Sequence, residues 1–420
     1  MKKFAFVFLF VFTLSGCAGV MTTRLDNVRS ATANNNFIES ATQFSSSHDI
    51  TEQNSLELLI TGYAQFLDGN YASSDKTFEE FNKRNIDTTS GSFMREATNI
   101  VAGRMASEYR PYMMDSLFVS YYQIWDAIGE NRRDDVRVII NQSYARQQKM
   151  SREYADLVQK NSAHGVDENN SELMSELDRA KSTWGAYSDI MNPALMYLSG
   201  IWFLNAGDFN DAETYLKRAV GMTNNNSYIA TDLNLAQKNT RPQNTTWIFI
   251  ESGFAPRLRE QTISLPVITG GGIIWSSIAI AVPEFGRSNI SINGAKPLAD
   301  VNAMFMTEFN EYNINDALRA WGAASARTVA QAAAYNSNSK YSGLIGLTST
   351  IFSIATTDAE VRSWATLPET ISVLRMNTGD LIDAKLDAIF GSDVKLPKSG
   401  NYLIYVRLTG GDPVVHIFKI

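Results

Sequence analysis

A five-residue pattern occurs twice in this chain with a constant separation of 138 residues. Both copies place two glycines, an aromatic residue, a small residue and a large apolar residue at the same relative positions. The copies are Gly62, Gly69, Tyr71, Ser74 and Phe78, and then Gly200, Gly207, Phe209, Ala212 and Leu216. Apolar residues around the first copy recur at helical spacing over 55–84 and are interrupted by Asp68-Gly69-Asn70. The pattern predicts a unit of two antiparallel helices joined by a tight turn.

This unit resembles the tetratricopeptide repeat, in which a glycine of the first helix sits where the second helix packs closely. An interval of 138 residues accommodates four repeats of about 34 residues. A degenerate repeat is expected between the two copies, around Gly129-Glu130-Asn131. The match covers about 51–223 and departs from the consensus at Ser74, where alanine is usual. The alternative is a pair of unrelated helical hairpins that share two glycines by chance.

Stacked helical hairpins bury their apolar faces against each other and form a superhelix whose concave side is lined by first helices. Such a groove usually holds a peptide or a helix of a partner protein. The candidate lining residues are Tyr63, Phe66, Ile201 and Asn205. The alternative is that these side chains belong to the core, which is more common for aromatic residues at helical spacing.

The composition changes at 224–246, where Asn-rich and Thr-rich stretches predict a linker at the edge of the helical part. Strands are predicted beyond it at 247–250, 263–268, 273–282, 402–408 and 414–420, with the last two forming a hairpin. Helices are predicted at 300–311 and 315–334. We therefore expect an α+β multidomain protein, with a TPR-like α-helical solenoid at 51–223 followed by a mixed α/β domain at 247–420.

Three local features of this second domain invite a functional interpretation. The glycines of Thr269-Gly270-Gly271-Gly272 lack the motif and the following helix that a phosphate-binding loop needs, so they predict a hairpin turn. The apolar, hydroxyl-rich segment 343–355 could insert into lipid or a partner, or form a buried helix or loop. Arg362 and Trp364 would form a partner-binding hot spot if exposed, whereas a buried Trp364 would close the core.

The N-terminus combines Lys2 and Lys3, an apolar run at 4–14 and the sequence Leu14-Ser15-Gly16-Cys17. This is typical of an export signal, and the apolar run is too short to span a bilayer. The last four residues resemble the lipobox of bacterial lipoproteins. That resemblance implies removal of 1–16 as a signal peptide and covalent attachment of acyl chains such as palmitate to Cys17. Because Cys17 is the chain's single cysteine, its acylation leaves no thiol for disulfides or metals.

The same resemblance implies a location. Lipoproteins with aspartate directly after the cysteine tend to stay at the inner membrane, and this chain has Ala18 there. We therefore expect a protein anchored to the outer membrane and facing the periplasm, with 17–50 as a tether that contains a short helix near 36–44. The formal net charge of −7 becomes −9 once Lys2 and Lys3 are removed, which disfavours nucleic acid as a partner.

Together with the lipobox and the repeats, Phe254-Ala255-Pro256-Arg257 after a strand and the Arg-Ser-Trp element ending at Leu367-Pro368 are similar to a family of poorly characterised tetratricopeptide-type lipoproteins of Gram-negative bacteria. The resemblance covers most of the mature chain. It implies an envelope location and a layout of helical repeats followed by an α/β domain. That family provides no catalytic residues to transfer.

Catalytic and metal motifs are also missing from the sequence. His48, His164 and His416 lie far apart, and none has metal-ligand spacing. We therefore expect no enzyme activity, no metal and no cofactor beyond the lipid on Cys17. The predicted function is a scaffold that binds envelope proteins, in complex assembly or in regulation of peptidoglycan synthesis. The alternative is a carbohydrate-binding or glycan-processing module on the C-terminal domain, with Trp275 or Trp364 as a sugar platform beside carboxylates.

Overall fold

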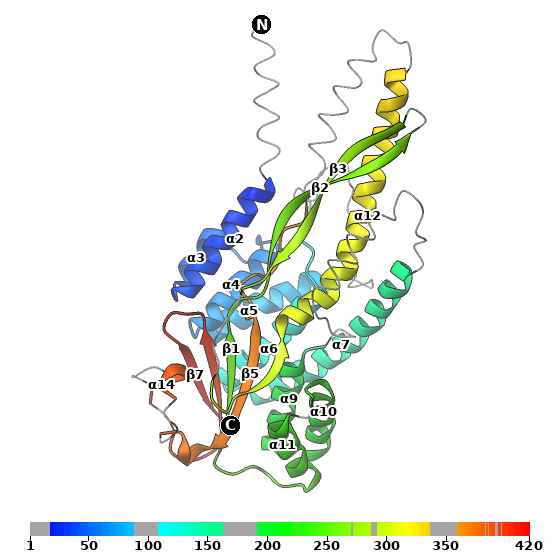
Figure 1. Ribbon diagram of the computed structural model, residues 1–420. Helices are drawn as coiled ribbons and strands as arrows, with labels where there is room; N and C mark the ends of the chain where they lie inside the picture. Colours follow the sequence, from blue (N-terminus) through cyan, green and yellow to red (C-terminus); the bar gives the residue numbers. More distant parts are fainter. Residues whose placement is uncertain are drawn as a thin grey trace.

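The computed structural model describes residues 17–87, 108–162, 191–224, 226–269, 272–286, 292–336, 359–382, 384, 386–390, 394, 395 and 397–420. Over these residues the protein is a mixed structure of helices and strands, as expected for the α+β class (Figure 1). The segment 343–355 lies outside the described residues. Within the described part, no helix combines the length and the apolar character needed to cross a membrane.

The residues after Cys17 form two packed helices, α2 (Cys17–Ala33) and α3 (Phe37–Phe44). Leu25, Val28 and Phe37 of this pair are buried in the main core. Arg29 also donates hydrogen bonds to the carbonyl oxygens of Ala255 and Ala365. Helix α3 agrees with the short helix expected near 36–44, whereas α2 differs from the tether expected over the rest of 17–50. A few apolar side chains on one helical face suffice to fold this mostly polar segment onto the body.

The two copies of the repeated pattern are helical hairpins, as predicted. The first is α4 (Ser55–Leu67) with α5 (Tyr71–Asn82), which continues into a π-helical turn η1 (Lys83–Asp87), and the second is α9 (Pro193–Ala206) with α10 (Phe209–Met222). A Cβ atom on Gly62 would lie 2.7 Å from the ring of Phe78, and one on Gly200 would lie 2.7 Å from Leu216. Both glycines therefore permit the close approach of the paired helices.

The described residues of this part also include helices α6 (Met113–Gly129), α7 (Arg133–Ser162) and α11 (Ser227–Gln237). The α6–α7 pair turns at the Gly129-Glu130-Asn131 sequence, as predicted. Helix α11 lies within the segment expected to be a linker, and it packs against α9 and α10. Asn226 caps its N-terminus, because the Asn226 side chain accepts a hydrogen bond from the backbone N–H of Tyr228. The Asn-rich composition thus marks a helix cap rather than a linker.

A five-stranded sheet has the order β4-β5-β1-β6-β7. Its strands are β1 (Thr245–Ser252), β4 (Lys296–Asp300), β5 (Thr370–Asn377), β6 (Tyr402–Leu408) and β7 (Val414–Lys419). Strand β1 runs parallel to β6 and antiparallel to β5, and β6 and β7 form the predicted hairpin. Strands β4 and β5 were not predicted. A 3-10 turn η4 (Thr378–Asp380) and a short helix α14 (Asp387–Phe390) follow β5.

An elongated arm projects away from this sheet (Figure 1). It consists of the hairpin β2 (Arg257–Thr269) and β3 (Gly272–Glu284) and of helix α12 (Val301–Asn336). The two strands pair in antiparallel register up to Thr269 and Gly272, so they form the expected hairpin, and Gly270 and Gly271 lie outside the described residues. The two helices expected at 300–311 and 315–334 are one continuous helix. Its Ala320, Trp321 and Ala324 pack against Leu265 and other apolar residues of the hairpin.

The helices and one face of the sheet share the main hydrophobic core. Trp247, Phe249 and Tyr405 of the sheet contact residues of α6 and α9 such as Trp125 and Tyr197. The opposite face carries Ile248, Ile250, Ile404 and Val406, and is covered in part by α14. The alternation of these residues along the strands follows the two-residue period of β structure. The helical and sheet parts are therefore packed together through side chains of both.

Candidate functional site

The residues predicted to line a partner groove lie in the interior. Tyr63, Phe66 and Ile201 have at most 1% of their surface exposed. Asn205 is half-buried, and its side chain donates to the carbonyl of Ile201 and accepts from the Asn401 side chain. These positions face the sheet and do not form an open concave surface. The structure thus favours the alternative that they belong to the core.

Arg362 and Trp364 are buried as well. Trp364 packs within 6.1 Å of the ring centroids of Tyr63, Phe78 and Tyr122. The guanidinium of Arg362 binds both carboxylate oxygens of Glu360 at 2.6 and 2.7 Å. Trp364 therefore closes the junction between helices and sheet, which was the second interpretation of this element.

A buried carboxylate, Glu251 of β1, lies at the centre of that junction. It accepts hydrogen bonds from the hydroxyls of Tyr405 at 2.6 Å, Tyr63 at 3.1 Å and Tyr122 at 3.1 Å. Arg407, its partner in the parallel register between β1 and β6, is also fully buried. Burial raises the pKa of Glu251, although the charge of Arg407 and the tyrosine hydrogen bonds act in the opposite direction.

This tyrosine cluster joins α4, α6, β1 and β6 through a single side chain. Because Glu251 is fully buried, no solute reaches it in this state. A buried carboxylate with three donors is well satisfied, so the arrangement holds the helices against the sheet. We interpret it as a structural element that specifies how the two parts dock.

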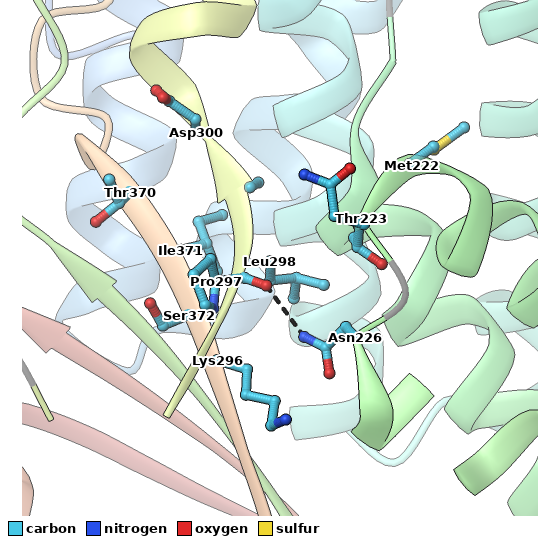
Figure 2. A pocket seen from close by; sticks show the side chains of 12 residues that line it. Met222, Thr223, Asn226, Lys296, Pro297, Leu298, Asp300, Thr370, Ile371 and Ser372 are labelled. Carbon is cyan, nitrogen blue, oxygen red and sulfur yellow. Dashed lines mark hydrogen bonds between the residues drawn. The ribbon is translucent and has the colours of Figure 1, made fainter. Parts of the chain in front are cut away.

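An open cleft is found elsewhere, beside β4 at the edge of the sheet (Figure 2). Its volume is about 570 Å³. The cleft lies between the end of α10, the loop to α11, and strands β4 and β5. The described lining residues are Met222, Thr223, Asn224, Asn226, Lys296, Pro297, Leu298, Ala299, Asp300, Thr370, Ile371 and Ser372.

The cleft combines polar and apolar lining residues with the outermost strand of the described sheet. Figure 2 shows Lys296 and Asp300 at the two ends of β4, with the Asn226 amide reaching across to the carbonyl oxygen of Pro297 at 3.0 Å. Asp300 also accepts a hydrogen bond from the backbone N–H of Ala303 and so caps the start of α12. The cleft thus presents one cationic and one anionic side chain, separated by a short extended backbone.

In the described ranges, no group of three or more His, Cys, Asp or Glu side chains is placed to hold a metal ion. His416 is packed among aromatic rings, including Phe66 and Tyr405. Burial lowers the pKa of His416 to about 4, so its imidazole is neutral at pH 7. His164 lies outside the described residues.

The alternative of a sugar site required an exposed indole beside carboxylates. Trp364 is 2% exposed, and Trp275 stands at the tip of the β2–β3 hairpin. The described lining of the cleft contains one carboxylate, Asp300, and no aromatic side chain. The described residues therefore do not bring an indole and carboxylates together in this cleft.

Comparison of the chain with protein-family models, with curated proteins and with solved structures finds no match. The cleft was not predicted from the sequence, because it is assembled from three segments that lie far apart in the chain. One local signal was present: Pro297 beside Lys296 is typical of a strand at the edge of a sheet, where proline does not interrupt a ladder.

Proposed function

We propose that this protein is a lipoprotein of the outer membrane, anchored through acylated Cys17 and facing the periplasm. The support is the lipobox-like sequence Leu14-Ser15-Gly16-Cys17, which follows a basic and apolar export signal. Helix α2 begins at Cys17 and is packed against the body, so a lipid at this residue holds the whole folded protein close to the membrane surface. Two or three acyl chains at about 0.8 kcal/mol per buried methylene suffice for stable anchoring.

The anchored body acts as a scaffold for protein–protein interaction, and the cleft beside β4 is its binding site. The cleft is the observation that carries this proposal, because it is open and combines hydrogen-bonding groups with two opposite charges. A short extended segment of a partner fits such a site. Its acidic side chain would lie at Lys296 and its basic side chain at Asp300.

The helical hairpins support the cleft structurally. We propose that α4–α5, α6–α7 and α9–α10 are degenerate TPR-like repeats, supported by the glycine contacts to Phe78 and Leu216. In this arrangement one face of the repeats packs against the sheet. The loop after α10, rather than a concave groove, then contributes to partner binding. The resemblance to envelope lipoproteins suggests assembly of envelope complexes or regulation of peptidoglycan synthesis as the setting.

In-cell photocrosslinking from inside the cleft tests the proposal. A photoreactive amino acid replaces Ser372 in the cleft and, as a control, the exposed Asn210 at the opposite end of α10. We expect a discrete envelope protein to crosslink from position 372 and not from position 210. The same product should be lost with Lys296→Glu, which reverses one charge of the cleft.

Cys17→Ser serves as the test of the anchor in the same experiment. Loss of both membrane fractionation and the crosslink would support a tethered scaffold. The proposal is contradicted if position 372 gives no protein product, or if glycan fragments are captured there instead. Circular dichroism of Lys296→Glu checks that the variant is folded.

A further inference from the structure

The tip of the β2–β3 hairpin exposes three consecutive large apolar residues. Ile273, Ile274 and Trp275 have 66%, 38% and 68% of their surface exposed. They account for three of the eight large apolar residues that are exposed among the described positions. Scattered apolar residues on a surface are ordinary, but a contiguous group at the end of a projecting arm calls for an explanation.

The hairpin is charged at its base and uncharged toward its tip. Arg257 and Arg259 at the base form ion pairs with Asp26 and Glu284. From Gln261 to Pro283 the sequence contains no Asp, Glu, Lys or Arg. The exposed hydroxyls of Ser264 and Ser277 form a hydrogen bond with each other at 2.8 Å. This distribution suits contact with a medium of low polarity.

The tip points in the same direction as Cys17. Contacts between α2 and the start of the hairpin show this direction. Arg29 of α2 donates to the carbonyl oxygen of Ala255, and Asp26 accepts hydrogen bonds from Arg257 and Arg259. Moving back along α2 toward Cys17 therefore corresponds to moving forward along β2 toward its tip. In Figure 1 the start of α2 and the hairpin tip accordingly face the same end of the molecule.

Helix α2 and the β2–β3 hairpin are long enough for Cys17 and the hairpin tip to reach the same membrane surface. Cys17 lies nine residues before Asp26, which is about 13 Å of helix. Thr269 lies ten residues beyond Arg259, which is about 33 Å of strand. Since the tip extends farther than Cys17, a membrane that touches both requires the arm to be inclined to the bilayer.

The arm is also packed against the body, so contact of its tip with a membrane would orient the whole protein. Both oxygens of Glu308 on α12 accept backbone hydrogen bonds from Met113 and Met114 at the start of α6, at 2.6 and 3.1 Å. Tyr154 of α7 donates to the carbonyl of Thr307. Farther out, Trp321 of α12 is buried against the hairpin. The tip is thus connected to the body through packed elements.

We propose that the hairpin tip, Ile273 to Trp275, inserts into the lipid monolayer that also anchors Cys17. Tryptophan and isoleucine are well suited to this position, because the indole prefers the membrane interface and the aliphatic side chains prefer the acyl region. The outer edges of a two-stranded sheet keep unpaired backbone groups, so only the tip enters the hydrocarbon while the rest stays among the headgroups. The anchor and the tip together fix the orientation of the cleft relative to the membrane. This inference rests on the proposed anchoring at Cys17.

The test uses the mature chain without its native cysteine, tethered independently of acylation. Cys17→Ser carries an N-terminal polyhistidine tag that binds vesicles of phosphatidylethanolamine, phosphatidylglycerol and a nickel-chelating lipid. Ile273→Cys in this background is labelled with an environment-sensitive fluorophore, and exposed Lys238→Cys at the end of α11 is the control. Spin-labelled lipids added to the vesicles quench fluorophores that enter the acyl region.

We expect quenching at least threefold stronger at position 273 than at position 238. Adding Ile274→Ser and Trp275→Ser should remove most of that difference, whereas Ile382→Ser, another exposed isoleucine, should leave it unchanged. Equal quenching at 273 and 238 would overturn the proposal, and so would an in-cell photocrosslink from position 275 to a protein. Mass measurement of native Cys17 reports acylation separately, so failure of the anchor is distinguishable from failure of the tip.

Discussion

The indole Nε1 of Trp247 donates a hydrogen bond to Oδ2 of Asp232 at 2.7 Å. The same oxygen accepts from the Tyr197 hydroxyl at 2.7 Å, and Oδ1 accepts from Nε of Arg375 at 2.8 Å. Asp232 is fully buried, so one carboxylate of α11 ties together α9, β1 and β5. The short helix in the segment expected to be a linker is therefore part of the junction that builds the cleft.

Replacement of Asp232 should strongly destabilise the fold. Asp232→Ala leaves the Arg375 guanidinium, the indole and the Tyr197 hydroxyl without their acceptor, and we expect a loss of about 3 kcal/mol in the free energy of unfolding. Urea denaturation followed by tryptophan fluorescence measures it. The exposed Asp380→Ala should change the midpoint little, and a similar midpoint for both variants would contradict the assigned role.

The tyrosine cluster can be tested by removing one hydroxyl. Tyr405→Phe deletes the shortest hydrogen bond to buried Glu251, and we expect a cost of about 2 kcal/mol because the acceptor is an ionisable group. Tyr402→Phe on the same strand is the matched control, since Tyr402 is only half-buried and lies outside the cluster. Thermal unfolding of both variants should separate them by several degrees.

The glycine of the first helical hairpin should not tolerate a side chain. Gly62→Ala places a Cβ atom 2.7 Å from the Phe78 ring, so we expect a loss of about 1–3 kcal/mol as the hairpin is forced apart. Gly221→Ala in α10 has open space around its Cβ position and should be neutral or stabilising by about 0.4–1 kcal/mol. Equal stability of the two variants would show that the close helix contact is not required.

Asp126 of α6 should make stability depend on pH. It is fully buried and accepts a hydrogen bond from Ser74, and burial raises its pKa well above the ordinary value. The folded protein then retains a proton that the unfolded chain releases. The free energy of unfolding therefore falls as pH rises from about 4 toward the raised pKa.

The variant Asp126→Asn removes this titration while keeping an amide of similar shape. We expect the urea midpoint of the native protein to decrease more between pH 5 and pH 8 than that of Asp126→Asn. Asp232 and Glu251 also have raised pKa values from burial, so the dependence should be reduced rather than abolished. Asp380→Asn is the control and should keep the pH dependence of the native protein. If the urea midpoint of Asp126→Asn changes with pH as much as that of the native protein, Asp126 does not hold a buried proton.

Much of the secondary structure could be predicted from local pattern. The glycine turns at Gly69 and Gly207 have φ of 80° and 83°, a left-handed conformation that glycine adopts without strain, and the helices on both sides follow from apolar spacing. The alternation of apolar residues likewise located β1, β2, β3, β6 and β7. Strand β4 was missed because Lys296 to Asp300 is short, contains a proline and carries little alternation. Strand β5 was also missed, although Ile371 and Val373 alternate with polar residues along its first half.

The candidate site could not be predicted in the same way. Asn226, Lys296 and Thr370 approach one another only because β5 pairs with both β1 and β4 while α11 packs on the preceding hairpin. None of these pairings has a local signature. The burial of Tyr63, Phe66 and Trp364 was also undetermined, since an aromatic residue at helical spacing is compatible with a groove or with a core.

The sequence by itself determined the lipobox-like pattern on which the proposed anchoring at Cys17 rests, the helical hairpins and the absence of charge in the outer part of the β2–β3 hairpin. These features depend on residues close together in the chain, where propensity, turn chemistry and periodicity act directly. Only the tertiary structure decided that the hairpins pack on the sheet, that Glu251 and Asp232 join the two parts, and that the cleft opens beside β4. Such contacts arise between segments far apart in sequence, and they are selected by the packing of a shared core rather than by any local preference.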